Sequence, residues 1–293
     1  MDWTRPIDIY CERVSAAFWA EPLNALTNLA FIAAGLGALA LSRRSSAGRG
    51  PWLWLSLLMA GGIVALLSQV IGAVWAATAT DAPLSMVVVT TLASIAVLGI
   101  ALTFAPARFP DPGVPWPVLW LSANAVVVGV GSFLFHTVAT PWAGFADTGP
   151  IMMFILGFFA VTMNRFAGLG WGRAAAVTFG FLLGMVALSA GLRVVVGDLA
   201  GGSQSYVPAL VALLGVGAWL HAAREHPAGR ALMQAGGVFA VSLTFRSLDG
   251  PLCEMLPIGT HFLWHVLNGL VFWILLRALV RHGDAPGLRP ARA

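Results

Sequence analysis

The chain contains no lysine, only two cysteines and very little charge for its length. Of its 293 residues, 10% are charged while 59% are hydrophobic, and the mean hydropathy is +0.85. Soluble domains carry roughly 25% charged residues, so this composition excludes an ordinary soluble globular protein. Repeated apolar runs of about 20 residues match the thickness of a bilayer core. We therefore expect an all-α, polytopic transmembrane helical bundle.

Other absences narrow the class further. No basic patch is interleaved with aromatic side chains, so we expect no nucleic-acid partner. The basic residues are all arginine, and in a membrane protein their distribution reports topology. A basic n-region and a small-residue cleavage site are both missing before the first apolar run, so we expect no signal peptide.

Apolar runs broken by glycine, proline and charge predict nine spans. They are expected near 22–42, 52–74, 84–106, 116–137, 148–165, 173–193, 206–222, 230–247 and 259–281. The stretch 52–106 is an inserted helix pair or, alternatively, a re-entrant hairpin. The predicted organisation is an extracytoplasmic segment over 1–21, a helical bundle over 22–281 and a cytoplasmic tail over 282–293.

Arginine placement predicts the orientation. When the arginines are grouped by alternate loops, twelve fall on one side of the membrane. The four on the other side are Arg5, Arg13, Arg193 and Arg246. The positive-inside rule then puts the N-terminus outside and the C-terminus in the cytoplasm. Short loops favour a bacterial inner membrane.

The two cysteines both fall on the predicted outer side. Cys11 and Cys253 lie in short segments that precede helices. An oxidising compartment permits a disulfide there, and the alternative is two unrelated buried thiols. We expect the bond.

Three histidines lie within or at the edge of predicted spans, where ionisable side chains are costly and mark functional sites. His261 and His265 are one helical turn apart on one face, so both can bind one metal ion. The predicted topology places His136, at the end of its span, at the same membrane face. Three histidines with a fourth position left for water are typical of catalytic zinc.

Two other interpretations of these histidines stay open. The pair in the last span can be a packing pair without metal. Haem is the second alternative, but its two axial ligands approach from opposite sides, and two imidazoles on one helix face cannot do so. The four-residue spacing therefore favours zinc.

Two polar residues flank His136 in the stretch GSFLFHTVATPWAGFADTGP (131–150). Ser132 precedes the histidine by one turn on the same face. Asp147 follows at the expected start of the next span, and a hairpin would return it to His136. Taken singly, Ser132 is a small packing residue and Asp147 an N-cap. A carboxylate and a hydroxyl beside three histidines favour a catalytic site.

The segment before the first span is acidic. Asp8, Glu12 and Glu21 precede the first helix, and Asn24 and Asn28 follow on one helix face. One interpretation is a solvated cap, which is favourable at a helix N-terminus. The other is an oxygen-rich calcium site, and composition does not decide between them.

Four segments together resemble the alkaline ceramidases, in the superfamily that includes the adiponectin-receptor-type membrane proteins. CER…FWAEPLNALTNL (11–29) is similar to the N-terminal family motif, and GSFLFH (131–136) is similar to its Ser-x-x-x-His element. The Ala-Asp at 146–147 matches the aspartate eleven residues on. HFLWHVLNG (261–269) resembles the terminal His-x-x-x-His helix.

This resemblance implies a seven-helix zinc enzyme that hydrolyses the amide of ceramide or a related N-acyl lipid. It implies zinc ligands at His136, His261 and His265. Asp147 would act on the attacking water, and Ser132 would hold the site or the developing oxyanion.

The same resemblance implies a calcium ion near the N-terminus. Glu12 and Glu21 match its carboxylates, and Asp8 is a third candidate with different spacing. Cys11 and Cys253 match a family disulfide.

The predicted extra helix pair over 52–106 departs from the seven helices of the family, and it bears on how the substrate reaches the site and on which substrate it is.

Two rival functions stay open. One is a non-catalytic membrane receptor or structural protein in which zinc only staples helices. The other is a hydrolase of the same chemistry that cleaves a lipid ester or phosphodiester.

Overall fold

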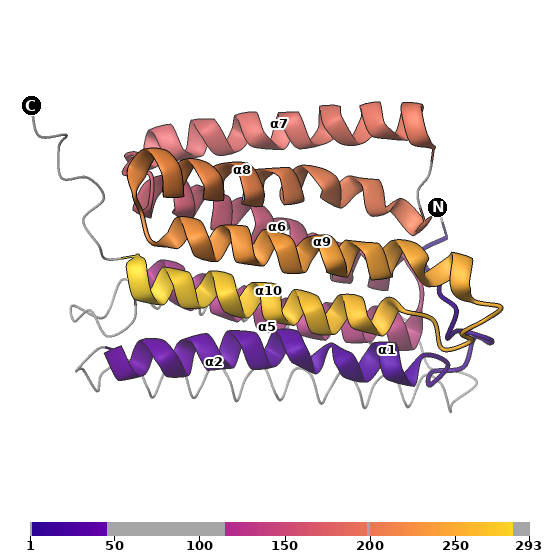
Figure 1. The fold of residues 1–293 in the computed structure, drawn as a ribbon. Helices are drawn as coiled ribbons and strands as arrows, with labels where there is room; N and C mark the ends of the chain where they lie inside the picture. Colours follow the sequence, from indigo (N-terminus) through magenta and orange to yellow (C-terminus); the bar gives the residue numbers. More distant parts are fainter. Residues whose placement is uncertain (1, 46–114, 198–199, 284–293) are drawn as a thin grey trace, which may run out of the picture.

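The computed structural model describes residues 2–45, 115–197 and 200–283. These residues form long helices joined by short turns (Figure 1), and seven helices are long and apolar enough to cross a membrane. The all-α transmembrane bundle is therefore confirmed. The elements are α1 (Pro22–Thr27), α2 (Leu29–Ser45), α5 (Trp116–Val138), α6 (Pro141–Arg165), α7 (Trp171–Val196), a 3-10 helix η2 (Ala200–Tyr206), α8 (Val207–Arg224), α9 (Ala228–Leu252) and α10 (His261–His282).

Seven of the nine predicted spans correspond to these helices, with α1 and α2 together forming the first. The predicted pair over 52–106 lies outside the described residues, as does most of the predicted tail over 282–293.

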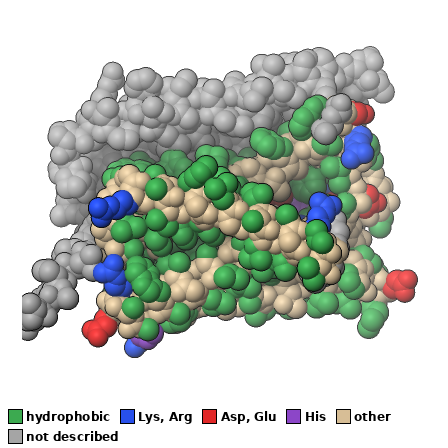
Figure 2. Space-filling view, turned by 90° about the horizontal axis from the view of Figure 1, so that it is seen from above, with side chains coloured by type: hydrophobic (Ala, Val, Ile, Leu, Met, Phe, Trp, Pro, Cys, Tyr) green, Lys and Arg blue, Asp and Glu red, His purple; other side chains and the backbone are tan. Residues whose placement is uncertain are grey.

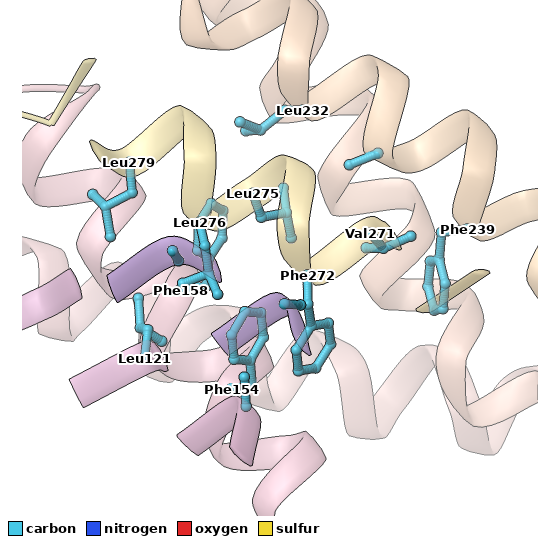
Figure 3. Packing of buried hydrophobic residues seen from close by; sticks show 14 of the residues in the cluster. Leu121, Phe154, Phe158, Leu232, Phe239, Val271, Phe272, Leu275, Leu276 and Leu279 are labelled. Atoms are coloured by element: carbon cyan, nitrogen blue, oxygen red, sulfur yellow. The ribbon is translucent and has the colours of Figure 1, made fainter. Parts of the chain in front are cut away.

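The last helix lies in the interior of the bundle. α10 packs against α2 on one side and α9 on the other, and α5 packs against α2 and α6. Their shared core is aromatic: Figure 3 shows Phe154 of α6 beside Phe272 of α10, and the two rings stack with centroids 3.7 Å apart. α10 is thus held between α2 and α9.

The outer surface is apolar. In the part of the face that the described residues form, Figure 2 shows hydrophobic side chains along its length, with charged side chains near its two ends. α7 alone exposes Val177, Phe179, Leu183 and Val186. Apolar side chains exposed along a whole helix fit lipid as the surrounding solvent, so the protein is an integral membrane protein.

The start of α6 differs from the prediction. The helix begins at Pro141 after the N-cap Thr140, and not near residue 148, so Asp147 lies inside its second turn. The interpretation of Asp147 as an N-cap is therefore wrong. Proline is favoured in the first helical turn, but small and polar residues in this turn lower the hydropathy, which hid the helix start.

A close approach between α5 and α6 brings Asp147 back to the end of α5. A Cβ atom added to Gly131 would clash with the carbonyl oxygen of Ala146. Only glycine fits at this crossing. The hairpin therefore depends on Gly131.

The N-terminal segment is fastened to the end of α9. Cys11 and Cys253 form a disulfide with Cα atoms 5.2 Å apart, which confirms that prediction. The backbone N–H of Cys11 also donates to Oδ2 of Asp249 at 3.1 Å. These links hold the segment across the end of the bundle where α10 begins.

Candidate metal centre

The three predicted histidines meet at one end of the bundle. His136 lies in the last turn of α5, and His261 and His265 lie in the first two turns of α10. One ring nitrogen from each lies within 4.8 Å of the other two. All three side chains are at most 2% exposed. The chain therefore places three imidazoles around one buried point.

Each imidazole keeps one nitrogen without a hydrogen-bond partner among the described residues. These atoms are Nε2 of His136, Nδ1 of His261 and Nε2 of His265. A buried polar atom left without a hydrogen-bond partner destabilises the fold by about 1–3 kcal/mol. Three such nitrogens close together are therefore typical of a site that binds a ligand. Three imidazole nitrogens are a donor set that fits zinc. The rings, with centroids 4.6 to 5.2 Å apart, leave no room for a haem plane between any two of them.

Two of the histidines are oriented through their other nitrogen. Nδ1 of His136 lies 2.6 Å from Oε2 of Glu21, and Nδ1 of His265 lies 3.0 Å from Oγ1 of Thr27. The Thr27 hydroxyl donates to the carbonyl of Leu23, so its oxygen accepts from His265. Metal-binding histidines in proteins have such partners, which fix the tautomer. In both cases Nε2 remains for a metal.

His261 is oriented by packing and by the helix start. Its ring stacks on Tyr10 with centroids 3.7 Å apart. Burial raises the pKa of the Tyr10 phenol, so this ring stays neutral. Oδ1 of Asp249 accepts the backbone N–H groups of Thr260 and His261 at 2.7 and 2.9 Å. Asp249 thus caps α10 at the residue that carries the first of its two imidazoles.

The predicted carboxylate and hydroxyl also reach the site. Ser132 and Asp147 are buried, and their side chains are hydrogen-bonded to each other. Oδ1 of Asp147 has no partner among the described residues. Asp147 and His261 line the same cavity, so a molecule in that cavity can contact both.

The residues predicted for calcium do not form one oxygen cage. Glu21 is 2% exposed; its carboxylate pairs with Nε of Arg13 and accepts from Nδ2 of Asn24 at 3.0 Å, besides its contact with His136. Arg13 also donates to the carbonyl of His136 at 3.0 Å. The carboxylate of Glu21 is therefore already paired with a guanidinium.

The other two candidates are engaged elsewhere or exposed. The two oxygens of Glu12 accept the backbone N–H groups of Leu23 and Asn24 at 2.7 and 2.8 Å. Asp8 is exposed. With both glutamates occupied, this donor set does not fit calcium as arranged, and calcium binding stays a prediction of the resemblance.

Two cavities lie near the histidines, and His261 lines one of them. We call this one the polar cavity because Asp147 and Arg246 also line it, together with Tyr10; it has about 530 Å³ of empty space, its open part included. The other, the apolar cavity, has about 750 Å³ on the same measure. Ile151, Tyr206 and Trp264 line both cavities, so the two meet at a shared wall.

Sequence reasoning missed several of these partners. Arg246 counted only as a topology marker, although a charge inside a predicted span is itself a signal of a site. Thr27 and Asp249 gave no signal, because their partners are far away in sequence.

Comparisons of the chain with protein-family models, with curated proteins and with solved structures found no match. The geometry of this centre and the motif resemblance are therefore the grounds for a function.

Proposed function

We propose that the protein is a zinc-dependent hydrolase that cleaves the amide bond of ceramide or a related N-acyl lipid within the membrane. The observation that carries the proposal is the group of three buried imidazoles, each with an unpartnered nitrogen, beside the carboxylate of Asp147. His136, His261 and His265 would hold the zinc ion. The resemblance of four segments to the alkaline ceramidases supports the same function.

Zinc supplies Lewis-acid chemistry to such a site: it polarises a carbonyl and lowers the pKa of water to about 7. Asp147 is the general base that takes a proton from the attacking water and then delivers it to the leaving nitrogen. The water oxygen joins the acyl carbon as the C–N bond breaks, giving a fatty acid and an amine. Ser132 holds the Asp147 carboxylate by its hydrogen bond and is the candidate donor to the developing oxyanion.

The apolar cavity is the place for the acyl chain. Its lining follows one face of α10 from Trp264 to Leu275, roughly 16 Å at 1.5 Å per residue. Phe154 and Phe272 in Figure 3 belong to this lining. Cavities between helices that are lined mainly by apolar side chains suit lipid ligands, and this one ends at Trp264, one turn from His261.

The predicted setting fits this proposal. An N-terminus outside and a C-terminus in the cytoplasm would place the metal centre near the outer leaflet of a bacterial inner membrane. The N-terminal segment with the disulfide would then lie in the oxidising compartment that its formation requires.

The test is metal analysis and hydrolysis of defined lipids by the purified protein. We expect about one zinc per chain and release of fatty acid from an N-acyl lipid, with both lost in His261→Ala. Asp147→Asn should keep zinc and lose roughly 10²–10⁴-fold in turnover, as expected for removal of a general base. Ester or phosphodiester lipids with the same chains serve as controls.

Either of two results would contradict the proposal. Hydrolysis that survives His261→Ala would exclude the histidine centre as the catalyst. The second result is a protein that binds zinc but hydrolyses none of the lipids, and that only melts at a lower temperature when zinc is removed. It would indicate a receptor or structural protein in which zinc holds helices together.

A further inference from the structure

A buried guanidinium stands next to the proposed catalytic groups. Arg246 lies inside α9, within a membrane-spanning helix, and only 9% of the residue is exposed. Charged side chains at membrane depth are costly and are kept for a function. Arg246 is the one arginine among the described residues that line the polar cavity.

The surroundings of Arg246 hold its guanidinium in place. It lies 5.4 to 5.8 Å from the ring centroids of Tyr10, Tyr206 and Trp264. Its Nη1 donates to the Tyr10 hydroxyl at 3.0 Å. Three aromatic faces fix the side chain by cation–π contacts, so the guanidinium is pre-oriented at the cavity wall.

The cavity charges come from two different helices. Asp147 belongs to α6, where Ser132 of α5 holds its carboxylate, and Arg246 belongs to α9. Both line the cavity together with His261. A lipid with its amide at His261 and its acyl chain beyond Trp264 leaves its headgroup in the polar cavity with Arg246.

We propose that Arg246 binds an anionic headgroup, a carboxylate or a phosphate, and that the substrate is an anionic N-acyl lipid and not neutral ceramide. The planar fork of a guanidinium matches the oxygens of carboxylate and phosphate and binds them in pairs. This inference rests on the proposed hydrolase function and adds the substrate class to it.

A set of lipids with one acyl chain tests the inference. N-hexadecanoylglycine carries a carboxylate, N-hexadecanoylphosphoethanolamine a phosphate, and N-hexadecanoylglycinamide and the hexadecanoyl ceramide carry no charge. We expect kcat/KM for one of the anionic lipids to exceed that of the neutral ones by about tenfold to a hundredfold, since a charged hydrogen bond is lost without the anion. The two anionic lipids decide between carboxylate and phosphate.

Three variants connect this preference to the residue. Arg246→Gln should reduce the preference to within about threefold, Arg246→Lys should keep part of it, and Arg281→Gln, at an exposed site, should leave it unchanged. Equal kcat/KM for charged and neutral lipids in the unaltered protein overturns the inference, even where Arg246→Gln fails to fold. A preference that survives Arg246→Gln overturns it as well.

Thermal stabilisation separates this inference from the proposed hydrolase. N-hexadecanoylglycine should raise the melting temperature of the unaltered protein more than its glycinamide does, and this difference should vanish in Arg246→Gln. Stabilisation by the anion without hydrolysis of any lipid would refute the hydrolase and keep the anion site. Hydrolysis together with equal stabilisation by both ligands would keep the hydrolase and refute the anion site.

Discussion

The carboxylate of Glu21 lies 2.6 Å from Nδ1 of His136 and at the same time pairs with the guanidinium of Arg13. The chain Arg13–Glu21–His136 thus joins the N-terminal segment to the candidate metal centre. Each member is buried. Because Arg13 also donates to the carbonyl of His136, the arginine contacts the histidine both directly and through the glutamate.

Removing the charge of Glu21 should weaken zinc binding. In Glu21→Gln we expect the zinc affinity to fall about 10- to 100-fold, the effect of losing a partner that orients a ligand histidine. Zinc competition with a chromophoric chelator measures it. Asp8→Asn is the matched control, because Asp8 is exposed, and an unchanged affinity in Glu21→Gln would refute the orienting role.

Removing Arg13 should destabilise the fold at this end of the bundle. Arg13→Met leaves the buried Glu21 carboxylate without its guanidinium partner, and breaking a buried pair from one side costs about 3–5 kcal/mol. A drop in the melting temperature of the detergent-solubilised protein measures it. Arg5→Met, at an exposed position, should melt like the unaltered protein.

Calcium chelation should have no effect. Since Glu21 pairs with Arg13 and both oxygens of Glu12 accept backbone N–H groups, EGTA should change neither the melting temperature nor the hydrolysis rate. A zinc-selective chelator should lower both. A loss of stability with EGTA that calcium alone restores would show that the calcium predicted from the resemblance binds after all.

Breaking the disulfide should loosen the metal centre. The bond joins residues 242 positions apart in sequence, and native disulfides contribute about 2–4 kcal/mol. The double variant Cys11→Ser, Cys253→Ser should melt lower and lose zinc faster, because Tyr10 and Asp249 position His261. Reductant should reproduce this in the unaltered protein and leave the double variant unaffected.

Hydropathy predicted the seven described spans, and motif spacing predicted the three histidines that meet. Local spacing placed His261 and His265 on one face. The even number of helices between α5 and α10, four, brings the start of α10 to the end of the bundle where His136 lies. The true start of α6 was missed because its first turns are small and polar. Positions such as Thr27, 238 residues from His265, become neighbours only through helix packing, which no local pattern encodes.

The partner of Glu21 likewise could not be predicted from the local sequence. Sequence indicated a carboxylate near a helix start, which is compatible with a cap, a calcium ligand or a histidine partner. The choice depends on which side chain lies opposite, and here it is His136 from α5. That Arg246 is a charged residue inside a span could be read from the sequence. Its aromatic neighbours could not, because they come from three separate parts of the chain.

Two of the three imidazoles belong to α10, the last of the described helices. A nascent chain that is still emerging from the ribosome before this helix holds a single ligand and cannot retain the ion. In the proposed enzyme, catalytic competence would therefore arise only after α10 has been made, and copies truncated before this helix would be inert toward the lipids around them.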